Sequence, residues 1–187
     1  MGTQQDLANA LQRVESVLQR RPEAGIHDDA PATARWNGGT RVVVHHANGT
    51  QVPSDMPAEL GGSGDQVTPG WLFRAGLASC AATSIALVAA TRGITLSTLE
   101  VQAASRSDAR GLIGMQDAAG APVYAGPGDM QLRVRIAAPG VAPERLRALV
   151  ADGCSRSPIP QAVQHATPLA CTVDVVTGVE AGTGVAA

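Results

Sequence analysis

Cysteine is the residue type in this chain best suited to nucleophilic or redox chemistry, and it occurs at three positions, Cys80, Cys154 and Cys171. An odd number of cysteines at wide spacing does not form a disulfide framework. No Cys-X-X-Cys pair occurs, and the four histidines form no helical i, i+4 metal pair. We therefore expect no bound metal.

Cys80 lies near the middle of residues 71–94, a stretch that is apolar almost all round. Thr68 is a suitable N-cap, Pro69 fits the first helical position, and Gly93 is the expected residue just after the helix end. A helix this long and apolar, over ~30 Å at ~1.5 Å per residue, is buried on most sides, and one small domain can hardly cover it alone. By itself the helix favours a packing role for its cysteine and a dimer for the protein.

The remaining pattern predicts an α+β fold with helices packed on an antiparallel sheet. Further helices are expected at residues 6–19, 142–153 and 157–166. Strands are expected at residues 98–109, 130–138 and 169–178, besides a β-meander with tight turns over residues 32–55. We expect an N-terminal helical arm (residues 1–25), a single domain (residues 26–179) and a flexible tail (residues 180–187).

Composition and charge narrow the classes of partner. The net charge of −2 gives no electrostatic case for binding nucleic acid or an anionic membrane. Only 16% of residues are charged while 44% are hydrophobic, which predicts apolar surface covered by a second subunit. Polar residues interrupt the apolar stretch around residues 75–90, which we judge too short to span a bilayer, and the first residues lack the pattern of a signal peptide. We expect a cytoplasmic homodimer.

Residues 52–94 resemble the signature of the OsmC/Ohr family, the osmotically inducible and organic-hydroperoxide-resistance proteins. The matching features occur in one order: Asp55 and Pro57, then Gly61 and Gly62, then Thr-Pro-Gly at 68–70, then Leu-Ala-Ser-Cys ending at Cys80. Residues 105–115 and 141–158 also resemble family segments, so the resemblance covers roughly residues 36–177.

The resemblance implies an OsmC-like fold, an intertwined homodimer in which antiparallel sheets from both chains wrap two long central helices. It also implies a thiol peroxidase without metal or cofactor, in which Cys80 attacks an organic hydroperoxide, becomes a sulfenic acid and condenses with a second cysteine. A dithiol reductant, such as a lipoyl group, then reduces the disulfide. In the family an arginine held by a glutamate lies over the attacking sulfur.

The arginine and its carboxylate partner are the first departure from the family pattern. The position that carries glutamate, directly after the proline at the helix start, is Gly70 here. Arg41 and Arg35, both on the early strands, are the candidate arginines. Glu59 or Asp65, in the loop before the helix, is the candidate replacement for the carboxylate.

The resolving cysteine is the second departure. The family places it directly before a proline, but here Ser157 precedes Pro158 and Cys154 stands three residues earlier. If this segment is helical, residues at i and i+3 share a face, and Cys154 is the candidate resolving thiol that reaches Cys80. If Gly153 ends the helix, Cys154 points elsewhere. We expect Cys171 to be structural, and Asp55 with the neighbouring glycines to shape the loop before the helix.

Two other functions remain open on the same scaffold. One is a catalytically inactive protein that binds a hydrophobic small molecule in an apolar cavity. The other is a redox sensor in which oxidation of Cys80 and Cys154 changes the dimer without turnover of peroxide.

Overall fold

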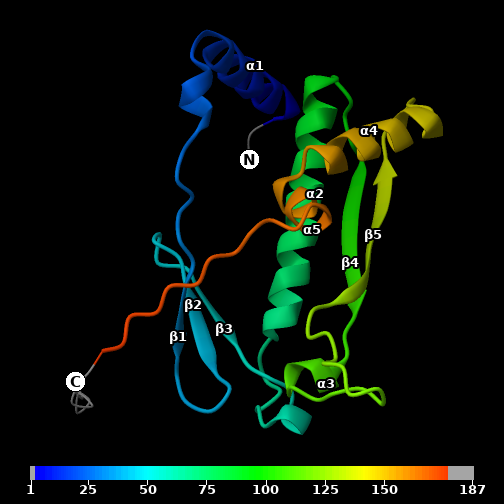
Figure 1. Ribbon diagram of the computed structural model, residues 1–187. Coiled ribbons are helices and arrows are strands. Elements are labelled where there is room, and N and C mark those ends of the chain that lie inside the picture. Colours follow the sequence, from blue (N-terminus) through cyan, green and yellow to red (C-terminus); the bar gives the residue numbers. More distant parts are fainter. Residues whose placement is uncertain (1–2, 177–187) are drawn as a thin grey trace.

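The chain is arranged around one long helix, and the computed structural model describes residues 3–176. This helix, α2 (Pro69–Thr91), has 23 residues and runs through the middle of the molecule (Figure 1). The Thr68 side chain accepts a hydrogen bond from the Trp71 backbone N–H, and Pro69 opens the first turn. The helix ends just before Gly93, so its start, its end and its caps are confirmed.

An antiparallel ribbon of two strands lies along α2 (Figure 1). Its strands are β4 (Thr98–Arg106) and β5 (Gly128–Ala137). On β5, partly buried residues alternate with exposed arginines, as the period of two predicted. Val134 lies opposite Val101 in the ribbon, and both pack against the core of the molecule.

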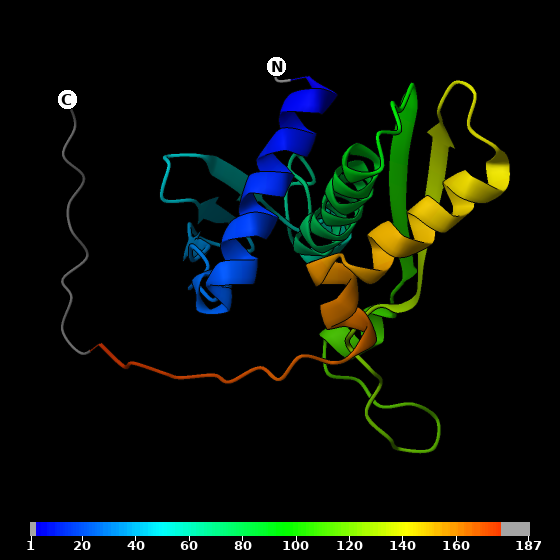
Figure 2. The ribbon, with the colours of Figure 1, turned by 90° about the horizontal axis from the view of Figure 1, so that it is seen from above.

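Two helices near the end of the described chain cross α2, namely α4 (Pro143–Ser155) and α5 (Pro158–Gln164). Figure 2 shows that α5 follows directly after α4 and that both lie beside α2. The buried apolar core forms where α4 meets α2, around Ile85 and Leu149, both fully buried.

The sequence analysis ended the α4 helix at Gly153, and this is wrong, because the helix continues to Ser155. Gly153 instead marks the closest approach of two helices. A Cβ atom at Gly153 would lie 2.7 Å from the Ile85 Cα atom, so only glycine allows this packing.

The N-terminal half supplies a helix and a small sheet. Helix α1 (Gln4–Arg20) packs on α2, and the Gln4 side-chain amide donates to the Ile94 carbonyl. The predicted meander is present as an antiparallel sheet in the order β1-β2-β3. Its strands are β1 (Thr33–Trp36), β2 (Val42–His45) and β3 (Gln51–Ser54). This sheet stands beside α2 with its strands exposed or half-buried (Figure 1), and Trp36 remains 75% exposed.

Three short helices complete the described elements: η1 (Pro22–Gly25), η2 (Ala58–Leu60) and α3 (Ala109–Leu112). The architecture is α+β with small antiparallel sheets and helices, as predicted. The intertwining of two chains stays a prediction.

The predicted final strand over residues 169–178 is wrong for the part of it that the structure describes. Residues 169–176 form no strand, and Leu169 is 96% exposed. A strand needs a neighbour for its backbone N–H and C=O groups, and this segment runs away from both sheets (Figure 2). The predicted tail over residues 180–187 lies outside the described residues.

The apolar stretch around residues 75–90 was judged too short to span a bilayer, but this judgement does not hold for the whole of α2. By length and composition it is able to cross a membrane, a test that the core helix of a soluble protein passes as well. In this structure it packs against α1, α4, α5 and β4. The expectation of no membrane partner stays a prediction.

Candidate functional site

The sulfur of Cys80 lies where the chain passes from α4 into α5. The Ser157 hydroxyl donates a hydrogen bond to Cys80 Sγ at 3.1 Å, and the Ile159 backbone N–H donates to the same atom at 3.5 Å. Ser157 is fully buried, whereas Cys80 is half-buried. Hydroxyl and amide N–H groups stabilise negative charge on an atom that they point at. The arrangement is therefore suited to a sulfur that carries charge during a reaction.

The local sequence explains why the Ser157 hydroxyl faces α2. Pro158 occupies the first position of α5 and forces the residue before it out of the helical conformation. Ser157 accordingly has extended backbone angles, φ −83° and ψ 115°. Its backbone N–H donates to the Cys154 carbonyl at 3.2 Å, which keeps the link between the two helices short.

An acidic side chain fixes the end of α4 against α2. Asp152 accepts hydrogen bonds from Arg92, at the end of α2, and from Arg156, whose Nε lies 2.7 Å from the carboxylate. This tie between two helices places the Ser157–Pro158 link over Cys80. The sequence analysis identified Ser157 only as a departure from a cysteine pattern and missed it as a partner of the sulfur. A serine directly before a proline at a helix start was the available signal.

Cys154 lies inside α4, but that helix ends at Ser155 and Ser157 has an extended backbone, so Cys154 and residue 157 do not share one helical face as the prediction required. Its side chain packs beside the core cluster around Ile85 and Leu149, and this burial raises the pKa of the Cys154 thiol. All three cysteines are free thiols. The structure brings Ser157 to the Cys80 sulfur, and the resolving role of Cys154 stays a prediction.

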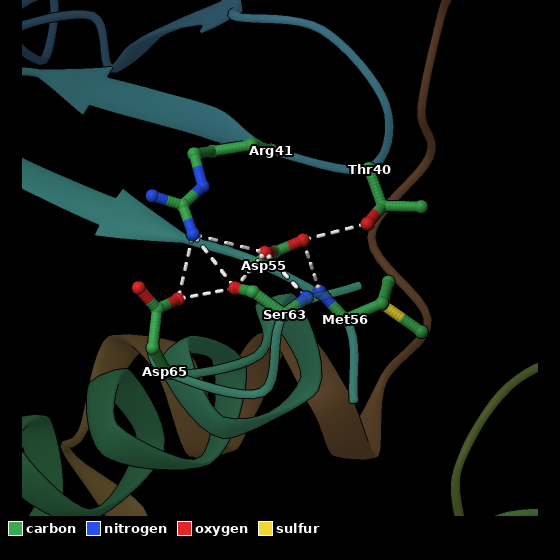
Figure 3. Close-up of polar contacts among 6 residues, drawn as sticks. All are labelled: Thr40, Arg41, Asp55, Met56, Ser63 and Asp65. Atoms are coloured by element: carbon green, nitrogen blue, oxygen red, sulfur yellow. Dashed lines mark hydrogen bonds and ion pairs between the residues drawn. The ribbon is translucent and has the colours of Figure 1, made fainter. Parts of the chain in front are cut away.

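Arg41 belongs to a polar cluster in the loop before α2 (Figure 3). One of its terminal nitrogens donates to Asp65 at 2.7 Å, to the Ser63 hydroxyl at 2.7 Å and to Asp55 at 3.4 Å. Of the two carboxylates considered for this arginine, Asp65 is thus the one that pairs with it. Hydrogen bonds from Ser63 and then from Arg41 lower the pKa of Asp65.

Asp55 is the buried centre of this cluster, and its side chain is 4% exposed. It accepts the Ser63 hydroxyl at 2.6 Å, the Thr40 hydroxyl at 2.6 Å and the Met56 N–H at 2.8 Å. Hydrogen bonds from Ser63 and Thr40 hold the pKa of Asp55 well below its usual range. A Cβ atom at Gly62 would lie 1.8 Å from the Met56 carbonyl oxygen. Asp55 and Gly62 therefore shape the loop, as expected.

The two candidate arginines do not meet Cys80 within this chain. The side-chain hydrogen bonds found for Arg41 all go to the loop cluster. Arg35 lies on the exposed strand β1 opposite Val43, and no hydrogen bond or ion pair of its side chain is found within residues 3–176. The proposed action of either arginine on the Cys80 sulfur stays a prediction.

A mostly apolar cavity of about 490 Å³ opens at the start of α2. It lies between the loop before α2, the first turns of that helix and the region of α3. Its apolar lining includes Met56, Pro57, Leu60, Phe73, Leu112 and Pro127. Arg74, which reaches toward Ser105 Oγ at 3.4 Å, adds one positive charge to the wall. Within the described range, residues 3–176, no cluster of His, Cys, Asp or Glu side chains is arranged to hold a metal ion.

Comparison with known proteins places these observations in a family context. The family model described as OsmC-like protein matches residues 62–172. No curated protein sequence matches the chain significantly. Among solved structures, an OsmC-like protein from Mycoplasma pneumoniae is 18% identical with a TM-score of 0.61, and the match covers 75% of this chain and 90% of that one.

Two further solved structures carry more specific descriptions. An organic hydroperoxide resistance protein from Elizabethkingia anophelis is 25% identical with a TM-score of 0.54, and the match covers 75% of this chain and 91% of that one. An organic hydroperoxide resistance protein OsmC from Legionella pneumophila is 24% identical with a TM-score of 0.54, with coverages of 74% and 93%.

Proposed function

Because this chain belongs to the OsmC-like protein family, we propose that it is a thiol-dependent peroxidase that reduces organic hydroperoxides with Cys80 as the attacking thiol. The observation that carries the proposal is the pair of donors, Ser157 Oγ and Ile159 N–H, directed at the Cys80 sulfur. The similarity to an organic hydroperoxide resistance protein supports the choice of substrate class.

The first chemical step follows from this geometry. The Cys80 thiolate attacks the terminal oxygen of the hydroperoxide, the O–O bond breaks, and the alkoxide leaves and takes up a proton as an alcohol. The sulfur is oxidised by two electrons to a sulfenic acid. The Ser157 hydroxyl and the Ile159 N–H stabilise the charge on the thiolate before the attack.

A homodimer is part of the proposal. Large apolar side chains stay exposed in the single chain, among them Trp36, Tyr124 and Val173, each about three-quarters exposed. Only 33% of the most apolar window of α2 is buried, although that helix is the core of the molecule. A second copy of the chain would bury these exposed side chains and the open side of α2. The proposal also includes a dithiol reductant and a cytoplasmic location.

Removal of the attacking sulfur tests the proposal. The variant Cys80→Ser should consume cumene hydroperoxide no faster than buffer with reductant alone, a loss of at least about a thousandfold in kcat/KM. The matched control Cys171→Ser changes an exposed cysteine and should keep the activity of the unaltered chain. Unchanged turnover in Cys80→Ser would refute the proposal.

The apolar cavity at the start of α2 favours a second candidate, a protein that binds a hydrophobic small molecule. Cys80 is not among the residues that line this cavity, which reaches along α2 as far as Arg74. An inert Cys80 thiol together with a ligand that co-purifies in native mass spectra would favour this candidate over the peroxidase.

A further inference from the structure

We infer that Cys80 works without a second cysteine of this chain: its sulfenic acid stays beside Ser157 and is reduced directly by a thiol from outside the chain. The inference rests on the proposed peroxidase function and changes the way in which the oxidised cysteine is reduced. The expected condensation of Cys80 with Cys154 would be absent, and the reductant would meet Cys80 itself.

The position beside the reacting sulfur is filled by a hydroxyl. Ser157 Oγ lies 3.1 Å from Cys80 Sγ, and the serine is fully buried. A hydroxyl cannot form a disulfide, but it can donate to a thiolate and accept a hydrogen bond from a sulfenic acid. This contact therefore holds the oxidised sulfur in place and does not resolve it.

Cys154 is held away from this role by the packing of α4. Ile85, the residue against which Gly153 packs, lies five residues beyond Cys80, or about 7.5 Å further along α2 at ~1.5 Å per residue. The Cys154 side chain packs into the same core cluster. Arg92 and Arg156 both hold the last turn of α4, which carries Cys154, in place through Asp152.

The Cys154 thiol is also a poor nucleophile where it lies. Attack on a sulfenic acid needs a thiolate, and burial raises the pKa of Cys154. Cys171 is exposed in the extended segment after α5, where no contact with Cys80 is found in the described part of the chain.

The reductive half then balances with two external thiols. The first thiolate attacks the Cys80 sulfur, the S–O bond breaks, and the sulfenic oxygen leaves as water after taking up a proton. This step leaves a mixed disulfide on Cys80. A second thiolate attacks the external sulfur of that mixed disulfide and releases Cys80. The two electrons that reduced the hydroperoxide come from these two thiols, which end as a disulfide outside the chain.

Single-turnover oxidation without added thiol tests the inference. The reduced full-length protein receives one equivalent of cumene hydroperoxide and then dimedone, which traps sulfenic acids. We expect the loss of one of the three thiols and a dimedone adduct on Cys80 in peptide maps. Cys154→Ala should give the same adduct and keep turnover with an external thiol, as should Cys171→Ala.

The variant Ser157→Cys provides a gain of function. A thiol at this position is close enough to the Cys80 sulfur for a disulfide, so oxidation should remove two thiols, join Cys80 to the introduced cysteine and abolish the dimedone adduct. Rapid oxidation of Cys80 in this variant without that disulfide would overturn the inference.

The outcomes separate the inference from the function on which it rests. A disulfide between Cys80 and Cys154, or between Cys80 and Cys171, in the unaltered chain overturns the inference and leaves the peroxidase standing. If the hydroperoxide oxidises Cys80 no faster than the exposed Cys171, both the inference and the proposed function fail.

Discussion

The contact between Ser157 and Cys80 determines which groups surround the Cys80 sulfur. The dipole of α2 does not help Cys80, because the cysteine lies some three turns inside that helix and the dipole acts near the first turn. The resemblance to the family instead led us to expect an arginine over this sulfur. The structure offers a different stabilising group, a buried hydroxyl assisted by a backbone N–H.

Removal of the hydroxyl should reduce the rate of attack while leaving the thiol in place. We expect Ser157→Ala to react with cumene hydroperoxide about fivefold more slowly at neutral pH, since one hydrogen bond contributes about 1 kcal/mol. The measurement is the stopped-flow rate of oxidation of the reduced protein. The control is Ser155→Ala, two residues before Ser157. The Ser155 hydroxyl donates to the Asp152 carbonyl, so this variant should react at the rate of the unaltered chain. Equal rates for both variants would remove Ser157 from the reaction.

Among the structural elements, the loop between β3 and α2 controls how the long helix begins. Asp55 accepts hydrogen bonds from Thr40 in the turn between β1 and β2, from its own neighbour Met56 and from Ser63, so the loop closes on a buried carboxylate (Figure 3). Arg41 links this carboxylate to Asp65. The chain directly before β2, where Arg41 lies, is thereby tied to the loop that leads into α2.

The loop cluster should make stability depend on acid pH. The pKa of Asp55 is lower in the folded protein than its unfolded value of about 3.9, so its contribution is complete above pH ~4 and is lost as the pH falls toward the folded value. We expect Asp55→Asn to lower Tm by several degrees at pH 7, and the gap to the unaltered chain to narrow below pH ~4. Thermal unfolding followed by circular dichroism at several pH values measures this.

The control for the acid prediction is Asp28→Asn, a substitution at an exposed aspartate outside the helices and strands. It should leave Tm unchanged at every pH. A gap between Asp55→Asn and the unaltered chain that stays constant from pH 7 to pH 3 would contradict the pKa argument, although the hydrogen bonds would still matter for folding.

The molecule as a whole has an unbalanced distribution of apolar surface. The core gathers where α2, α4 and the β4–β5 ribbon meet, whereas the β1–β3 sheet and the segment after α5 leave apolar residues open. In that segment every second residue is apolar, namely Leu169, Cys171, Val173 and Val175. This period of two is typical of a strand, although the segment pairs with no other part of the described chain.

A second copy should supply that neighbour. We expect a solution mass of about 38 kDa, twice the 19.0 kDa of one chain, and a Tm that rises with protein concentration. Light scattering after size-exclusion chromatography measures the mass. Val173→Asp should shift the protein toward the monomer, while the neighbouring Thr172→Asp, on the other face of the segment, should not. A monomer with a concentration-independent Tm would exclude the dimer.

The sequence by itself determined the features that depend on near neighbours. The caps and ends of α2, the meander and the alternation along β5 were all predicted, because capping, turn chemistry and periodicity act within a few residues. The motifs around Cys80 likewise pointed to the OsmC-like family, which the family model over residues 62–172 confirms.

Only the tertiary structure decided what meets the sulfur. Ser157 and Cys80 are 77 residues apart in the chain, so no local rule reports their contact. Gly153 was assigned as a helix end by a local rule, but the approach of α4 to Ile85 requires glycine there for a different reason. The strand predicted after residue 168 failed because pairing is a property of two segments, and within residues 3–176 no second segment pairs with this one.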